Sequence, residues 1–196
     1  MILKKKIVLG STSKYREQLF TRLGLEFESA SPDTDESPIT GETPATTALR
    51  LAIAKAQSLK KKFQDALVIG ADQVADQNGI AIGKPGTRKR SFEQLQQMRG
   101  QTLVFHSAIA LLNTATDRIQ SRIVATTVRF RELSNQEIEN YLDRENALDC
   151  AGSAKSEGVG IALMTSMQSD DPTALIGLPL IALIDMLHAE GISVLA

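Results

Sequence analysis

The strongest constraint on the fold is an apolar stretch in the middle of the chain, residues 67–74, with the sequence LVIGADQV. Its β-branched and apolar residues predict a buried strand that ends on Asp72. Open α/β sheets bind ligands outside the carboxyl ends of their strands, so an acid at this point is held rigidly where ligands gather. We interpret Asp72 as the centre of an active site. Because aspartate is also a common turn residue, a turn cap after a core strand is the alternative.

Length, charge and cysteine content narrow the class of protein. The 196 residues suit one domain or a two-lobed one, and 42% hydrophobic residues allow a full core without disulfides. A formal net charge of -1 gives no general electrostatic case for binding DNA, RNA or a membrane surface. The one cysteine, Cys150, and the two distant histidines, His106 and His188, argue against cysteine- or histidine-rich metal sites. Any metal should therefore be a hard cation on oxygen ligands.

The apolar runs of the chain are short. The first of them, residues 7–9, falls short of the roughly 7–15 residues of a signal-peptide core. No run approaches the roughly 18 apolar residues of a membrane span. The sequence therefore predicts a soluble, cytoplasmic protein.

A candidate anion site lies near the start of the chain. Residues 7–10 predict a short strand, residues 11–13 are small hydroxyl residues, and residues 14–23 predict a helix. Free N–H groups at a helix start, hydroxyl donors and the helix dipole all favour phosphate, and Arg16 would add a bidentate charged fork. The alternative is that a serine such as Ser13 only caps the helix and Arg16 is solvated.

An acidic loop, residues 31–41, follows a second predicted strand at residues 25–30. Loops that follow strands often carry the site residues of α/β folds, so Glu36 or Asp35 is a candidate oxygen ligand for Mg²⁺ or Mn²⁺. The alternative is a loop whose acids are simply solvated.

The next predicted helix begins after Thr43, with Pro44 at its first position, and runs to about residue 62. Lys55 falls inside its apolar stripe rather than on its solvated face. An unpaired buried charge is costly, so the sequence predicts an anion close to Lys55. The alternative is that the lysine stem packs and the amine reaches solvent.

After Asp72 the chain predicts a β-hairpin over residues 74–82, on the Asn78-Gly79 turn signal. Lys84 follows between a glycine and a proline, on backbone that the proline keeps extended. It is a candidate point charge for a phosphate, and the alternative is a plain loop lysine.

The rest of the chain completes one α/β unit with a cleft between two lobes. We predict helices over residues 87–98 and from Ser134 to about residue 144, and an antiparallel strand pair over residues 101–112 and 122–131. Residues 149–161 crowd glycines and serines together with Lys155 and Glu157, which is typical of a binding loop or, alternatively, of a structural turn. A last helix follows, and Pro179 marks its start or a break. We find no linker, so the prediction is a single domain over residues 1–196.

In this order, the motifs resemble those of the Maf family of nucleoside triphosphate pyrophosphatases, in particular the subgroup that acts on 7-methyl-GTP. The motifs span residues 7–190, and they are LGSTSKYR at 9–16, DE at 35–36, KA at 55–56, GADQV at 70–74, GKP at 83–85, GSAKSEG at 152–158 and GLPL at 177–180. Gln73 stands where the subgroup acting on dTTP and UTP typically has threonine. Gly10 replaces a more usual alanine, and Tyr15 replaces a frequent tryptophan while keeping an aromatic ring for stacking.

The resemblance implies an elongated mixed sheet flanked by helices, in two lobes with a central cleft, similar to inosine triphosphate pyrophosphatase. It implies hydrolysis of a nucleoside triphosphate to the monophosphate and pyrophosphate, with Mg²⁺ or Mn²⁺, and a homodimer. Asp72 falls on the proton-acceptor position. The phosphate- and metal-handling positions fall on Ser13, Arg16, Glu36, Lys55 and Lys84. The positions that distinguish the base fall on Tyr15, Gln73 and Glu157.

Three alternatives stay open from the sequence. Asp72 can act as a general base or, with Glu36, as a metal ligand. The enzyme can prefer dTTP or UTP over 7-methyl-GTP. The chain can also be a nucleotide-sensing regulator without turnover, linked to cell division, in which case it needs the phosphate site but not Asp72 as a base.

Overall fold

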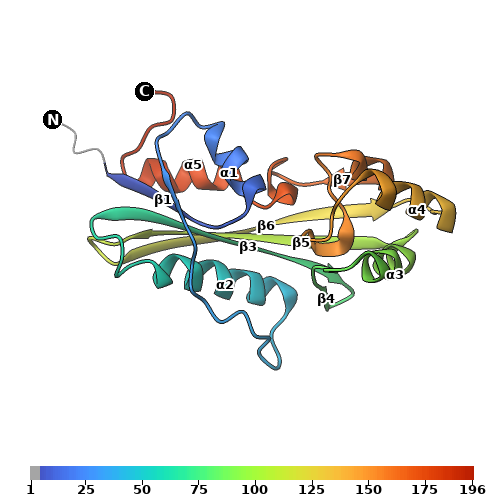
Figure 1. The fold of residues 1–196 in the computed structure, drawn as a ribbon. Helices are drawn as coiled ribbons and strands as arrows, with labels where there is room; N and C mark the ends of the chain where they lie inside the picture. Colours follow the sequence, from blue (N-terminus) through green and yellow to red (C-terminus); the bar gives the residue numbers. More distant parts are fainter. Residues whose placement is uncertain (1–4) are drawn as a thin grey trace.

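The computed structural model describes residues 5–196. The chain forms one seven-stranded mixed sheet with helices on both faces (Figure 1). The strand order is β2-β1-β3-β5-β6-β7, and β4 pairs with β3 outside this path. The molecule is elongated because β3, β5 and β6 are long, with 12, 12 and 13 residues. The predicted fold class, an elongated mixed α/β sheet flanked by helices, is confirmed.

The strands divide into a parallel and an antiparallel part. Strand β1 runs parallel to β2 and β3, whereas every other pairing is antiparallel. The strands are β1 (Lys6–Gly10), β2 (Glu28–Ala30), β3 (Ala66–Gln77), β4 (Ile80–Ile82), β5 (Thr102–Asn113), β6 (Arg118–Phe130) and β7 (Met164–Gln168). The helices are α1 (Lys14–Thr21), α2 (Pro44–Ser58), α3 (Arg88–Met98), α4 (Asn135–Arg144) and α5 (Leu180–Ala189). Three short 3-10 turns complete the chain, and they are η1 (Ala151–Ser153), η2 (Val159–Leu163) and η3 (Ala174–Ile176).

The local signals for helix starts and turns are confirmed. Thr43 caps α2, and Ser134 forms the predicted capping box with Glu137. Asn78 and Gly79 have φ values of 54° and 85°, as a tight hairpin turn requires. Three elements differ from their predicted bounds: α2 ends at Ser58 rather than near residue 62, β2 covers only residues 28–30, and β6 begins at Arg118 rather than at residue 122. In α2 and β2 the pattern of apolar residues runs past the end of the hydrogen-bonded element, whereas β6 pairs with β5 from Arg118 onward.

The prediction that the central strand ends on Asp72 is wrong, and so is the alternative of a turn cap. Strand β3 runs straight through Asp72 to Gln77, because β5 pairs with it continuously from residue 67 to residue 76. On the other side of β3, pairing with β1 ends at Gly70 of β3, and pairing with β4 begins at Ala75 of β3. Asp72 therefore lies beside the carboxyl end of β1, in the middle of its own strand.

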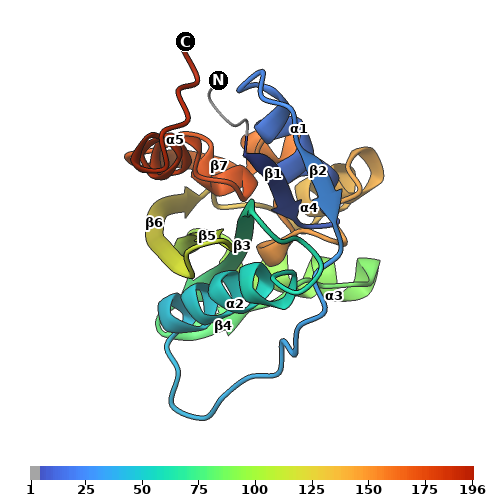
Figure 2. The same cartoon turned by 90° about the vertical axis from the view of Figure 1, so that its left-hand side faces the viewer.

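Helices cover the two faces of the sheet unequally. Figure 2 shows α2 on one face and α1 with α5 on the other. Small residues of α2 pack on the first face, where they meet Val8 and Val68, and they are Ala48, Ala52 and Ala56. Larger residues of α1 and α5 fill the second face, and they include Leu19, Phe20, Leu183 and Leu187. A third core, between α3, α4 and the ends of β5 and β6, forms the other half of the molecule.

Gly70 lets α2 lie directly against β3. A Cβ atom at this position would lie 2.1 Å from the carbonyl oxygen of Ala52 and 2.7 Å from the backbone nitrogen of Ala56. No side chain fits there without moving the helix. This close approach brings Lys55 of α2 next to Asp72, two residues beyond the glycine.

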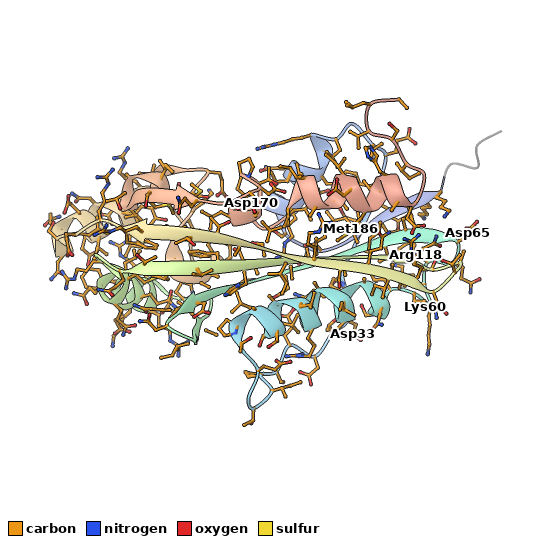
Figure 3. The ribbon with its side chains drawn as sticks, turned by 180° about the vertical axis from the view of Figure 1, so that it is seen from behind. Asp33, Lys60, Asp65, Arg118, Asp170 and Met186 are labelled. Carbon is orange, nitrogen blue, oxygen red and sulfur yellow. The ribbon has the colours of Figure 1, made fainter. Side chains whose placement is uncertain are left out.

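The far tip of the sheet is polar. Figure 3 shows Lys60, Asp65 and Arg118 gathered at this tip, while Asp170 lies toward the other half. Across residues 5–196, no helix has the length and apolar character needed to span a membrane.

Candidate active site

A cavity of about 1130 Å³ opens where β1 ends and β3 continues. Its wall includes the start of α1, the acidic loop, α2 and β3, the β4 region, and later segments around residues 146–157 and 175–177. Nine of the predicted site residues line it, and they are Ser13, Tyr15, Arg16, Glu36, Lys55, Asp72, Gln73, Lys84 and Glu157. The cavity is the predicted cleft, and it brings together motifs that are up to 144 residues apart, from Ser13 to Glu157.

Lys55 and Asp72 form a buried ion pair at the centre of this wall. Both residues are less than a tenth exposed, at 7% and 8%. Lys55 Nζ donates to Asp72 Oδ1 at 2.6 Å and also lies 2.7 Å from Glu36 Oε1. The prediction that Lys55 needs an anionic partner is confirmed, and the alternative in which its amine reaches solvent is wrong. Asp72 Oδ2 has no hydrogen-bond partner within residues 5–196.

The acidic loop contributes Glu36 and not Asp35. Asp35 Oδ1 accepts the backbone N–H of Ser37 at 2.9 Å, a local turn bond, and Asp35 does not line the cavity. The hydrogen bond from Lys55 lowers the pKa of Glu36 below its ordinary 4.5, partial burial opposes this shift, and the charges of Lys55, Lys84 and Arg16 add to it. Glu36 is therefore a carboxylate near neutral pH.

Arg16 is fixed by the backbone of two other segments. Its Nε donates to the carbonyl of Gly177, and its Nη1 donates to the carbonyl of Ala71, each at 2.8 Å. Burial lowers the pKa of Arg16 from its ordinary 12.5, and the carboxylates of Asp72 and Glu36 oppose this shift. An arginine stays protonated in such a site. The Nη2 group has no partner in the described part of the chain, and the alternative of a solvated arginine is wrong.

Ser13 is both the helix cap and a cavity residue. Its Oγ accepts the backbone N–H of Arg16 at 3.5 Å, and its own N–H donates to Ser11 Oγ at 3.1 Å. Ser13 therefore caps the helix, as the alternative predicted, and it also lines the cavity. Lys84 and Glu157, by contrast, are exposed residues at the cavity rim.

Gln73 is tied to the protein through its amide nitrogen. Its Nε2 lies 2.8 Å from Ser107 Oγ, 3.1 Å from the carbonyl of Ala174 and 2.9 Å from the carbonyl of Leu175. Ser107 Oγ also donates to the carbonyl of Ala174 at 2.6 Å. The side chain thus fixes turn η3 against the sheet, and its carbonyl oxygen is the atom left for a ligand.

Tyr15 meets the segment that precedes and includes η1. Burial is the main cause that raises the pKa of Tyr15 to about 12, and the charges of Cys150 and Asp149 add to it. Lys155 Nζ lies 5.5 Å from the centroid of the Tyr15 ring. Cys150 is half-buried, and burial raises the pKa of its thiol to about 12. The phenol and the thiol are therefore both neutral near pH 7.

Two acids that the sequence did not single out organise the cavity wall. Asp171 accepts from the N–H and hydroxyl of Thr173 and from the N–H of Ile181, so it fixes the turn whose Gly177 carbonyl binds Arg16. Its signal in the sequence is an Asp-x-Thr turn pattern after β7. Glu145 accepts from Lys155 Nζ and from the N–H of Val159. Its sequence neighbourhood carries no comparable signal.

Two carboxylates on the cavity wall, those of Glu36 and Asp72, could hold a metal ion. Within residues 5–196, no group of three or more His, Cys, Asp or Glu residues could hold a metal ion. Asp72 and Glu36 share the amine of Lys55, which places their oxygens on one side of the cavity. Mg²⁺ is often bound by one or two carboxylates together with waters and substrate phosphates. The two acids fit an ion that arrives with a nucleotide.

Comparison with known proteins finds strong sequence similarity. The family model described as "Maf-like protein" matches residues 6–190. The chain is 55% identical over 192 residues to the 7-methyl-GTP pyrophosphatase of Polaromonas sp. strain JS666, covering 98% of this chain and 88% of the relative. It is also 54% identical over 190 residues to the 7-methyl-GTP pyrophosphatase of Chromobacterium violaceum, covering 96% of this chain and 98% of the relative.

One solved structure shows partial similarity. It is the structure of the Staphylococcus aureus Ham1 protein, with a TM-score of 0.47 and 18% sequence identity. The match covers 65% of this chain and 73% of that one.

Proposed function

The chain belongs to the Maf-like protein family, and from this membership and the site geometry we propose that it hydrolyses 7-methyl-GTP to 7-methyl-GMP and pyrophosphate. The observation that carries the proposal is the buried Lys55–Asp72 pair beside Arg16 and Glu36 in one cavity. Cleaving a phosphoanhydride needs a water aimed at phosphorus, neutralised charge and a stabilised leaving group. The described side chains offer a group for each of these needs.

Asp72 is the proposed general base. Lys55 holds one carboxylate oxygen, Oδ1, so the side chain cannot rotate freely, and Oδ2 is left to accept a proton from the attacking water. Burial between α2 and β3 keeps this oxygen in one position. A base held rigidly within hydrogen-bond reach of its water fits this step better than an exposed acid.

Arg16, Lys55 and Lys84 are the proposed charge-neutralising groups for the triphosphate. Arg16 has two of its nitrogens fixed by backbone carbonyls, which aims Nη2 without loss of side-chain freedom on binding. Ser13 and the first turn of α1 add a hydroxyl and backbone donors. Preorganised cations of this kind stabilise charge as it develops on the pyrophosphate.

Glu36 is the proposed residue that would hold a divalent cation while Asp72 acts as the base, and Asp72 would be a second ligand only in the alternative in which it is not the base. A bound Mg²⁺ or Mn²⁺ supplies charge neutralisation on the phosphate oxygens and lowers the pKa of a coordinated water. The pKa of Glu36 is already lowered by Lys55, so its carboxylate is available as an oxygen ligand without a prior loss of its proton.

Tyr15, Gln73 and Glu157 are the proposed base-recognition residues. Methylation at N7 gives guanine a positive charge, which favours stacking on an aromatic ring and proximity to a carboxylate. Tyr15 offers the ring, Glu157 the carboxylate and Gln73 a carbonyl oxygen that can accept from the base. The fixed amide nitrogen of Gln73 determines which atom faces the ligand.

Pyrophosphate release from a nucleotide panel tests this function. We expect the highest kcat/KM for 7-methyl-GTP, with Mg²⁺ or Mn²⁺ present, compared with GTP, dTTP and UTP. A higher value for dTTP or UTP would support the other subgroup, and tight binding without release would support a nucleotide-sensing regulator. The exchange Gln73→Thr should lower the ratio of 7-methyl-GTP to UTP turnover, with Gln77→Thr on the same strand as its control. An unchanged ratio would count against this assignment of Gln73.

The remaining expectations concern the state of the protein in the cell. A single domain, a homodimer and a cytoplasmic location stay predictions from the sequence and the resemblance. Size-exclusion chromatography with light scattering tests the second of them directly.

A further inference from the structure

Glu145 joins the two parts of the segment that faces Tyr15. It stands at the end of α4, and its side chain is only 12% exposed. Its Oε1 lies 2.9 Å from Lys155 Nζ, and its Oε2 accepts the N–H of Val159 at 3.0 Å. One carboxylate therefore bonds both ends of the short turn that carries Glu157.

The glycines of this turn fit around Glu145. A Cβ atom on Gly158 would lie 2.1 Å from Glu145 Oε2, and one on Gly160 would lie 2.4 Å from the carbonyl oxygen of Lys155. The Gly-rich composition that marks this stretch in the sequence is therefore needed for the backbone to close around the carboxylate. The turn is shaped by that closure and not by a sheet or a long helix.

Lys155, which is bonded to Glu145, also contacts the ring of Tyr15. Its amine lies 5.5 Å from the ring centroid, within the range of a cation–π contact. Tyr15 lines the cavity whereas Lys155 does not, so the amine backs the ring without occupying ligand space. The backbone N–H of Lys155 also donates to the hydroxyl of Tyr141 at 3.2 Å, which fixes the lysine from its other side.

We propose that Glu145 is a positioning residue for base recognition, which holds Lys155 against the Tyr15 ring and fixes the turn that presents Glu157. The inference rests on the proposed nucleotide pyrophosphatase function, because it assigns the Tyr15 end of the cavity to the base. Glu145 itself does not line the cavity. It acts on the base through two side chains, and it leaves Asp72, Lys55 and Arg16 untouched.

The negative charge of Glu145 contributes to this role in addition to its two hydrogen bonds. The hydrogen bond to Glu145 is the largest cause that raises the pKa of Lys155, and the bond from Lys155 is the largest cause that lowers the pKa of Glu145. A neutral amide at this position would remove the nearest countercharge of Lys155 and leave it only the weaker influence of Glu157. For a cationic base such as 7-methylguanine, the less balanced charge of Lys155 is repulsive.

The variant Glu145→Gln tests the proposal, with Glu139→Gln as its matched control. Glu139 lies on the same helix and pairs with Arg88 at the surface. For Glu145→Gln we expect the KM for 7-methyl-GTP to rise about tenfold, the loss of one charge-assisted bond, while kcat stays within about twofold. Inhibition by inorganic triphosphate, which occupies only the phosphate groups, should change by less than about twofold. Lys155→Arg should keep a KM near that of the wild type.

A spectroscopic readout separates positioning from general damage. The chain has no tryptophan and two tyrosines, Tyr15 and Tyr141, and both adjoin Lys155. Near-ultraviolet circular dichroism therefore reports chiefly on this end of the cavity. We expect Glu145→Gln to change that spectrum and Glu139→Gln to leave it unchanged.

Two results would overturn the proposal. One is a wild-type KM and tyrosine spectrum in Glu145→Gln. The other is a parallel change in kcat, KM and triphosphate inhibition together with a lower melting temperature, which is what plain structural damage produces. If the wild-type protein hydrolyses none of the nucleotides, the proposed function fails separately. Binding of 7-methyl-GMP, followed by tyrosine fluorescence, then still tests the proposal through an expected loss of affinity of about tenfold in Glu145→Gln.

Discussion

Two lysine–carboxylate pairs hold the walls of the cavity, and they are built in different ways. The Lys55–Asp72 pair joins a helix to the central strand, and its side chains are 9% and 11% exposed. The Lys155–Glu145 pair joins a turn to the end of a helix, and its side chains are 24% and 12% exposed. The sheet and the close approach of α2 at Gly70 position the first pair. In the second pair the order is reversed, because the ion pair itself holds the turn in place.

This difference matches the demands of the two proposed roles, catalysis for the Lys55–Asp72 pair and base recognition for the Lys155–Glu145 pair. Attack on phosphorus needs atoms held within fractions of an ångström, which a central strand and a packed helix provide. Recognition of a base needs a surface that can differ between relatives, and turns change more easily than strands. We infer that replacing the first pair affects chemistry and folding together, and that replacing the second affects chiefly affinity for the base.

The largest effect is expected from Asp72→Asn, which keeps the shape of the side chain and removes its charge. Loss of a positioned general base should lower kcat about 10³-fold while nucleotide binding persists. Pyrophosphate release and equilibrium binding of 7-methyl-GTP measure the two quantities. Asp76→Asn is the control, because Asp76 lies on the same strand and contacts His106 and Gly79 outside the cavity. Turnover near the wild-type rate in Asp72→Asn would rule out the general-base role.

The next effect compares the two lysines directly. Lys55→Met leaves Asp72 charged and buried without its partner, so we expect the free energy of unfolding to fall by about 3 kcal/mol. Lys155→Met should cost about 1 kcal/mol, because that pair is more exposed to water. Urea denaturation measures both values.

A second substitution separates the loss of the charge pair from the loss of packing. If the unpaired charge of Asp72 causes the damage in Lys55→Met, adding Asp72→Asn should restore part of the stability. Equal costs for the two lysine variants would contradict the distinction between a pair placed by the sheet and a pair placed by a turn.

The sequence predicted the first region better than the second, for a physical reason. An inward lysine on an apolar stripe must have an anion, so a buried partner for Lys55 could be predicted from the pattern of its helix alone. The position of Asp72 within its strand could not be predicted. It depends on the pairing of β3 with its neighbours, since pairing with β1 ends at Gly70 while pairing with β5 continues. A single apolar run in the sequence does not reveal the register between strands.

The turn region shows what local patterns leave out. Residues 149–161 were predicted as either a binding loop or a structural turn. Glu157 lines the cavity, while the amine of Lys155 and the backbone N–H of Val159 bond Glu145. Glu145 gave no signal, because it follows an ordinary amphipathic helix and its partners are 10 and 14 residues away. Gln73 was assigned to the base, yet three of its contacts are with the protein, and tertiary contacts of this kind require the fold.

The smallest effect on stability is expected from Glu36→Gln, although Glu36 contacts the same lysine as Asp72. Its side chain is 58% exposed, so water screens the pair and the variant should lose less than about 1 kcal/mol at neutral pH. Lys55 lowers the pKa of Glu36 below 4.5, so this contribution is present above that pH and disappears as the pH falls through the lowered pKa. Urea denaturation at about pH 7 and about pH 3 should therefore show a small difference in unfolding free energy between wild type and variant that is smaller at the lower pH. A difference in unfolding free energy of more than about 2 kcal/mol at neutral pH would show that Glu36 behaves like the buried Lys55–Asp72 pair. Its proposed role in metal binding could then not be tested separately from its role in folding.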